Sequence, residues 1–164
     1  MNKRMTTQKI AIGFVAVALF VGSMTAHAAD FSVGVNAYQR GDYTTALQIF
    51  RQFADQGDAS AQNNLGLMYD KGQGVAQDYA AAVMWFRKAA DQGYAIAQAF
   101  LGLVYHFGNG VTWDYVQAYM WYNLAAAKGI NFARENRTLL AMEMTPVQIA
   151  EAQRLAREWK PKGK

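Results

Sequence analysis

Residues that could carry out nucleophilic or acid–base chemistry are scarce in this chain of 164 residues. After the first thirty residues it holds one histidine, His106, and two serines, Ser32 and Ser60, and the whole chain lacks cysteine. Ser60 lies at the start of one expected helix and His106 at the end of another. Along neighbouring helices the two positions are offset by about ten residues, on the order of 15 Å at about 1.5 Å per residue. A nucleophile and its base need about 3 Å. The sequence therefore predicts no serine–histidine triad.

Carboxylates are the other source of chemistry, because two of them can cleave a glycosidic bond. Asp42, Asp78 and Asp114 recur at a spacing of 36 residues, which indicates one repeated structural role, the N-cap of a helix. The glutamates fall in amphipathic C-terminal segments and are expected to be solvated: Glu135, Glu143, Glu151 and Glu158. With no cysteine and one histidine the usual transition-metal ligand sets are missing. We expect no metal and no cofactor.

Two Gly-x-Gly turns, at 72–74 and 108–110, invite comparison with phosphate-binding loops. Neither is followed by Lys-Ser/Thr or preceded by a strand pattern, so nucleotide binding is not expected. A Ser-x-x-Lys sequence is also absent, and that sequence carries the nucleophile of penicillin-binding enzymes. These observations predict a protein that is not an enzyme.

The first 28 residues have the order of an export signal. Lys3, Arg4 and Lys9 provide a positive start, residues 10–22 are apolar, and residues 26–28 read Ala-His-Ala. An apolar stretch of 13 residues rises only about 20 Å as a helix, too short for a bilayer core of about 30 Å. We expect cleavage after Ala28, no stable membrane insertion, and a periplasmic or secreted product.

Net charge excludes one class of partner. Loss of the three basic signal residues takes the 16 basic residues to 13, against 12 acidic ones, so the exported chain has a net charge of +1. An exported chain so close to neutral gives no electrostatic reason to bind nucleic acid. Only the segment from Arg154 to Lys164 is basic, and we expect a solvated, frayed terminus there, with 161–164 as a basic tail.

Internal repeats organise the rest of the chain. Residues 59–94 and 95–130 are identical at half of their positions, and a shorter repeat precedes them at about 31–58. Each full repeat is expected to form two helices, called helix A and helix B in chain order. Each of them carries its apolar residues on one stripe. A glycine such as Gly72 suits a left-handed helix cap, and Asp78 suits the next N-cap. Trp85 and Trp121 share one frame position and are expected to fill the core.

The shared frame resembles the Sel1-like repeat family, whose units of about 36 residues follow roughly A-x3-LG-x2-Y-x2-G-x-GV-x2-D-x3-A-x2-W-x3-AA-x2-G. Both full repeats match every one of those positions, and the first repeat looks like a tetratricopeptide unit with a tight turn at 40–42. The resemblance implies an all-α fold, a short right-handed α-solenoid of helix-turn-helix repeats. It also implies a role in protein–protein contacts.

The C-terminal segment departs from the frame, because no Gly-x-Gly-Val separates its two helices. Thr145, Pro146 and Gln148 have the order of a capping box at a helix start. We expect this helix to pair with one over about 132–142, forming a terminal cap over 131–160. The chain from 29 to 160 is then one solenoid domain, since the 136 residues left after cleavage suit a single core.

Stacked helix pairs leave part of each helix A on a concave face, the default binding surface of a solenoid. A helical wheel places one stripe of helix A there in each full repeat. We expect partner contacts from Asn63, Leu67, Ala99, Leu103, His106, Phe107 and Trp113. Trp113 lies in a loop where the other repeat has Gln77, so it is a candidate contact, although packing under the terminal cap is an alternative.

The sequence thus predicts an exported scaffold that binds a partner protein whose identity, like the oligomeric state, the residues leave open. The alternative is an envelope factor that binds peptidoglycan or acts like a β-lactamase, as some relatives of this fold imply. Those relatives are rich in cysteine, and this chain has none.

Overall fold

The computed structural model describes residues 30–162, and the predicted signal segment at 1–28 lies outside them. The chain divides into two compact units, whose described parts are residues 30–49 and residues 50–162. In the first part, residues 30–39 are helical and end in a turn at Arg40 and Gly41 before α2 (Tyr43–Asp55) begins. Asp42 starts α2, because its carboxylate accepts a hydrogen bond from the Thr45 amide at 3.1 Å. Hydrogen bonds from the Thr45 side chain and backbone lower the pKa of Asp42.

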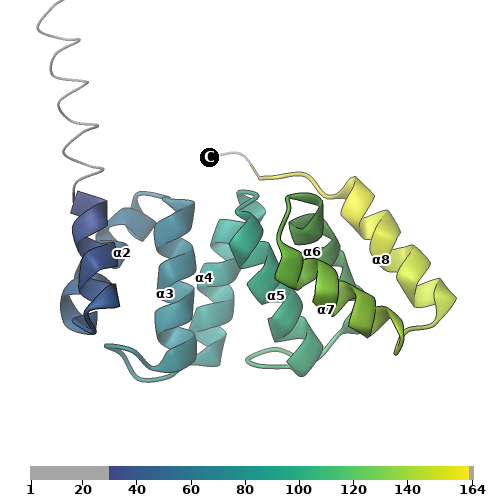
Figure 1. The fold of residues 1–164 in the computed structure, drawn as a ribbon, viewed down its shortest axis with the longest axis horizontal. Coiled ribbons are helices and arrows are strands. Elements are labelled where there is room, and N and C mark those ends of the chain that lie inside the picture. Colours follow the sequence, from purple (N-terminus) through teal and green to yellow (C-terminus); the bar gives the residue numbers. More distant parts are fainter. Residues whose placement is uncertain (1–29, 163–164) are drawn as a thin grey trace, which may run out of the picture. The chain divides into compact units, whose positions relative to one another are not determined.

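The second part is a succession of antiparallel helices (Figure 1). They are α3 (Ala59–Lys71), α4 (Tyr79–Asp91), α5 (Ala95–Phe107), α6 (Tyr115–Ala127), α7 (Asn131–Ala141) and α8 (Pro146–Glu158). α3 pairs with α4, α5 pairs with α6, and α4 packs against α5. Residues 30–162 contain no strand. The predicted all-α repeat architecture is confirmed.

The predicted capping residues are present on both sides of the loop that joins the two helices of each full repeat. Gly72 and Gly108 close α3 and α5 in left-handed conformations, with φ of 65° and 74°. Asp78 and Asp114 then cap α4 and α6, their carboxylates accepting from the amides three residues later at 2.9 and 3.0 Å. Each loop is therefore held at both ends by local hydrogen bonds.

Small residues let the helices of a pair approach closely. A Cβ added at Gly66 on α3 would lie 2.5 Å from the Phe86 ring on α4, and one at Gly102 would lie 2.3 Å from the Tyr122 ring on α6. Phe86 also stacks on Phe100 of α5, with ring centroids 5.0 Å apart, so it joins three helices. Trp85 and Trp121 are 8% and 3% exposed, as predicted for core residues.

The C-terminal helices pack differently from the prediction. The capping box of Thr145 and Gln148 is present at the start of α8. However, α7 and α8 both pack mainly against α6 and do not pair with each other as α3 does with α4. Their buried residues explain this, because each helix offers only two, Ala133 and Leu140 on α7 and Ala152 and Ala156 on α8. The expected α7–α8 pair was wrong in this respect.

Lys160 and Lys162 after α8 are exposed, as their charge suggested, but this segment is not frayed. Trp159 packs edge-to-face on Trp121, with centroids 6.1 Å apart. Three residues further on, the Lys162 amide donates to the Asp91 carbonyl at 2.7 Å, and its ammonium lies 2.7 Å from the Asp91 carboxylate. Residues 159–162 therefore cross from α8 to the end of α4, so the terminal cap is tied to the second repeat.

Trp159→Ala is expected to lower the free energy of unfolding by about 1 to 2 kcal/mol, less than a fully buried tryptophan costs because Trp159 is partly exposed. Chemical denaturation followed by circular dichroism measures the change. Lys160→Ala is the matched control, since Lys160 is exposed and such surface changes stay within about 0.5 kcal/mol. Equal stabilities for the two variants would show that the segment is not docked in solution.

Candidate functional site

The end of α5 and the start of α6 carry a cluster of aromatic side chains, here called the aromatic patch, made of His106, Phe107, Trp113 and Tyr115. The His106 and Phe107 rings stack with centroids 4.5 Å apart. His106 meets Tyr115 edge-to-face at 5.6 Å, and Tyr115 meets Trp113 at 5.3 Å with a tilt of 56°. The four rings thus form a continuous run along the α5–α6 loop, whose position Figure 1 shows.

Two rings of the aromatic patch are largely exposed. Phe107 and Trp113 are each 64% exposed, although both are large and apolar. His106 and Tyr115 are partly buried and support them from below. Exposed aromatic rings held in place by neighbouring rings lose little conformational freedom on binding, which is why such residues dominate many protein interfaces.

The second repeat builds the same loop without these aromatic residues. At the positions of His106, Phe107 and Trp113 it has Asp70, Lys71 and Gln77. The backbone closure is nevertheless the same, because the Asp78 amide donates to the Tyr69 carbonyl at 3.0 Å and the Asp114 amide to the Tyr105 carbonyl at 2.8 Å. The loop conformation therefore does not require three aromatic residues.

Gln77 shows what the loop position does when it is only structural. Its side-chain amide donates to the Asp70 carbonyl at 2.7 Å and to the Tyr79 hydroxyl at 3.0 Å. These two hydrogen bonds link the end of α3 to the start of α4. In the third repeat Trp113 takes the place of Gln77, so an exposed indole replaces this polar link.

The turn after α7 adds a carboxylate to the edge of the aromatic patch. The Tyr115 hydroxyl donates a hydrogen bond to Glu143 Oε2 at 2.9 Å. This bond, together with the negative charge of Glu143, raises the pKa of Tyr115, because a phenolate beside the carboxylate would be repelled. Glu143 itself is exposed.

Tyr122 lies beneath the aromatic patch and is fully buried. Its ring faces the edge of His106 at 6.2 Å and Phe132 at 6.5 Å. Burial raises the pKa of Tyr122. Its hydroxyl and His106 Nδ1 are buried and, within residues 30–162, have no hydrogen-bond partner. The patch therefore rests on a rigid aromatic base.

The structure brings together part of the predicted binding stripe. Leu103 lies one turn before His106 and Phe107 on α5, with Trp113 in the following loop. Leu67 lies on α3, and both leucines are partly buried against the core. Asn63 and Ala99 are each only 3% exposed, so their predicted place on an open surface was wrong. The wheel of a single helix does not show the adjacent helices that cover these two positions.

Two residues at the patch were not predicted as site residues. Tyr115 has the same frame position as Tyr79, and its repetition favoured a structural role. Glu143 lies in a turn whose neighbours depend on how α7 packs, and no sequence pattern indicated its contact with Tyr115.

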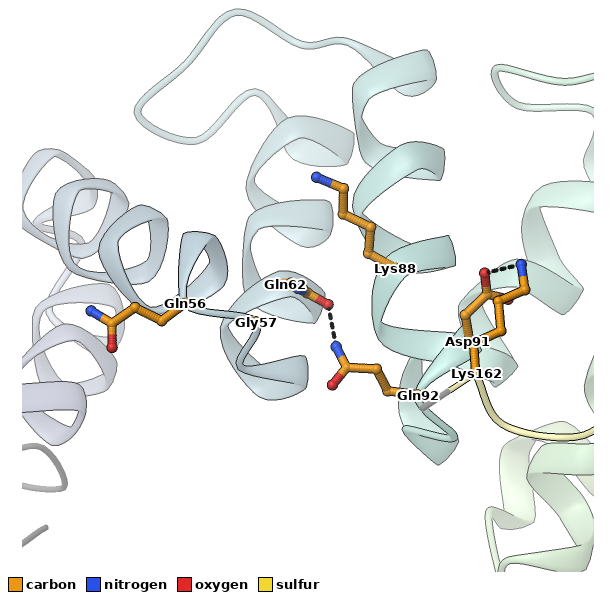
Figure 2. Close-up of a pocket in the computed structure, with 7 residues that line it drawn as sticks. All are labelled: Gln56, Gly57, Gln62, Lys88, Asp91, Gln92 and Lys162. Carbon is orange, nitrogen blue, oxygen red and sulfur yellow. Dashed lines mark hydrogen bonds and ion pairs between the residues drawn. The ribbon is translucent and has the colours of Figure 1, made fainter. Parts of the chain in front are cut away.

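The opposite end of the helix pairs carries a polar hollow of about 370 Å³. Figure 2 shows Gln92 bonded to Gln62 at 2.8 Å and Lys162 paired with Asp91 at its edge. Gln62 also donates to the Ala54 carbonyl at 3.2 Å. These polar groups satisfy one another, so the hollow reads as part of the packing between repeats.

Side chains that could act as nucleophile, acid or base are not assembled into a reactive centre in the described region. Ser60 Oγ lies 3.4 Å from the Tyr94 hydroxyl, whereas His106 is surrounded by aromatic rings. Residues 30–162 contain no group of three or more histidine, aspartate or glutamate side chains that could hold a metal ion. None of the helices between those limits is both long and apolar enough to span a bilayer.

Comparison with known proteins gives a consistent result. A family model described as the Sel1 repeat matches residues 28–58, 59–94 and 95–130. The crystal structure of c5321, a protective antigen of uropathogenic Escherichia coli strains displaying an SLR fold, is 35% identical with a TM-score of 0.77. That match covers 81% of this chain and 29% of that one.

A Sel1 repeat protein from Oxalobacter formigenes is 32% identical with a TM-score of 0.65, and the match covers 78% of this chain and 55% of that chain. The chain therefore spans less than two thirds of the length of either solved relative. A search of curated proteins gave no match.

Proposed function

Because the chain belongs to the Sel1 repeat family, whose members generally serve as protein-interaction scaffolds, we propose that it is an exported scaffold that binds a partner protein through the aromatic patch of its third repeat. The partner contacts Phe107 and Trp113 first, because these rings are the most exposed. Leu103, one turn earlier on α5, extends the contact surface towards the middle of the helix.

One observation carries this proposal, which is the difference between two repeats that otherwise share a frame. Asp70, Lys71 and Gln77 meet the needs of the loop in the second repeat. The third repeat keeps the loop geometry and replaces all three with aromatic residues. Exposed apolar surface that the loop geometry does not require is typical of a recognition surface.

The test transfers the second repeat's residues to the third. A triple variant carries His106→Asp, Phe107→Lys and Trp113→Gln. The corresponding loop of the second repeat already accommodates these three residue types. Tagged wild-type protein should retain a partner from an envelope extract, as detected by mass spectrometry, and the triple variant should lose it. Two aromatic anchors typically contribute about 2 kcal/mol or more each, enough to remove retention.

The matched control changes exposed apolar residues away from the patch. Val147 on α8 and Met84 on α4 are 79% and 46% exposed, and their replacement by lysine should leave partner retention intact. Retention by the triple variant with an unchanged circular dichroism spectrum would contradict the proposal. Sedimentation with purified peptidoglycan tests the alternative, because binding there by the wild-type protein but not by the triple variant would assign the patch to the cell wall.

Export is proposed from residues 1–28, whose charged start, apolar core and Ala-His-Ala sequence have the order of a cleaved signal. Protein recovered from the envelope fraction is expected to begin at Ala29. Intact-mass measurement settles the point, and a mass that includes Met1 would favour an uncleaved anchor instead.

A further inference from the structure

We infer that the partner presents an arginine or lysine side chain to the corner formed by Trp113, Tyr115 and Glu143. This inference rests on the proposed function and names the chemistry that the aromatic patch selects. Its basis is the contact between the Trp113 and Tyr115 rings together with the hydrogen bond from Tyr115 to the Glu143 carboxylate.

The two rings provide the apolar part of this corner. Trp113 and Tyr115 lie 5.3 Å apart at 56° to each other, so their faces are inclined instead of parallel. Trp113 is 64% exposed, which leaves much of its ring accessible. A cation within about 6 Å of an aromatic ring face is attracted by the ring quadrupole, and tryptophan is the strongest of the aromatic acceptors.

Glu143 provides the charge. Its carboxylate accepts a hydrogen bond from Tyr115. Within residues 30–162 the ion pairs involve Glu151, Glu158 and Asp91, and Glu143 takes part in none of them. The second oxygen of this carboxylate, Oε1, is not used by Tyr115 and can accept from a cation of the partner.

Cations of the chain itself lie close to three other aromatic rings, two in the repeats and one after α8. Lys88 lies 4.2 Å from the Trp85 ring centroid. The Arg87 guanidinium lies 5.6 Å from the Tyr105 centroid, and the Lys128 ammonium 5.6 Å from that of Trp159. Within the described residues no such cation covers Trp113. The patch therefore has the acceptors of this interaction without a donor.

An apolar or acidic partner fits this corner less well. An apolar segment seated on Trp113 and Tyr115 would take water from the Glu143 carboxylate without replacing its hydrogen bonds, which is costly. An acidic segment would be repelled. A cationic side chain offsets the desolvation of Glu143 and gains the ring contacts at the same time.

The test uses the full chain labelled with ¹⁵N and follows the indole N–H resonance of Trp113, assigned by its loss in Trp113→Gln. The probe is the peptide acetyl-Gly-Arg-Gly-amide, and the matched probe has citrulline in place of arginine. We expect a saturable shift with the arginine peptide at tens of millimolar or below. The citrulline peptide should bind at least about fivefold more weakly, as expected for loss of a charge contact at a partly exposed site.

Glu143→Gln keeps an acceptor for Tyr115 and removes only the charge. This substitution should weaken binding of the arginine peptide by about fivefold and leave binding of the citrulline peptide unchanged. Glu135→Gln is the control, since Glu135 is an exposed acid on α7 that makes no contact with the patch rings. Equal binding of the two peptides, no effect of Glu143→Gln, or no saturable shift would each overturn the inference. The proposed function would still stand if the triple variant lost its partner, so the two failures are distinguishable.

Discussion

Replacing Trp121 with alanine is expected to lower the free energy of unfolding by about 3 to 5 kcal/mol, as large-to-small changes of buried aromatic residues do. Trp121 is 3% exposed and belongs to the core formed by α4 to α8. Its ring also supports Trp159, so the variant loses the docking of the C-terminal segment together with the packing on α6. Both losses leave space that neighbouring helices fill only in part.

Thermal and urea denaturation measure this effect, and the chain contains its own control. Trp113→Ala removes the same side chain from an exposed position and should change stability by no more than about 0.5 kcal/mol. Trp85→Ala, at the matching frame position of the second repeat, should also lower the free energy of unfolding. Equal melting temperatures for Trp113→Ala and Trp121→Ala would place both indoles on the surface.

The repeat frame allowed most of the fold to be predicted because each frame residue has a local reason. Gly72 and Gly108 adopt left-handed conformations that other residues resist, and Asp78 and Asp114 satisfy free amides at helix starts. These interactions span only a few residues, so a sequence pattern is sufficient to locate them.

Exposure could not be predicted in the same way, because it depends on the helices that lie beside a given stripe. Asn63 and Ala99 lie on the predicted outer stripe and are nevertheless buried. Leu67 and Leu103 are partly buried against the core, so charged substitutions there would impair folding and binding together. Phe107 and Trp113 are better positions for separating binding from stability.

Contacts between segments far apart in the chain were also beyond the sequence pattern. The basic charges of the C-terminal segment predicted solvation, yet Trp159 finds an indole partner on α6 and Lys162 reaches α4. Glu143 likewise meets Tyr115 only because α7 turns back at the α5–α6 loop. In both cases tertiary packing brings together residues whose contact no local sequence pattern indicated.

Gly102→Ala is the second substitution with a large expected effect. Two opposing contributions decide whether it raises or lowers the free energy of unfolding. Alanine favours a helix over glycine by about 1 kcal/mol. The new Cβ, however, would lie 2.3 Å from Cδ1 of Tyr122, and that ring is fully buried against the patch residues. Because the ring has no free space to move into, α5 and α6 must separate, and overpacking of this kind costs about 1 to 3 kcal/mol or more.

A double-mutant cycle with Tyr122→Ala isolates the clash. Tyr122→Ala alone should destabilise the protein by about 3 to 5 kcal/mol through the cavity it leaves. Once the ring is absent, Gly102→Ala should cost nothing and recover part of the helix-propensity gain, giving a favourable coupling free energy of about 1 to 3 kcal/mol. Strictly additive effects of the two substitutions would show that the close approach of α5 to the Tyr122 ring does not limit packing in this repeat.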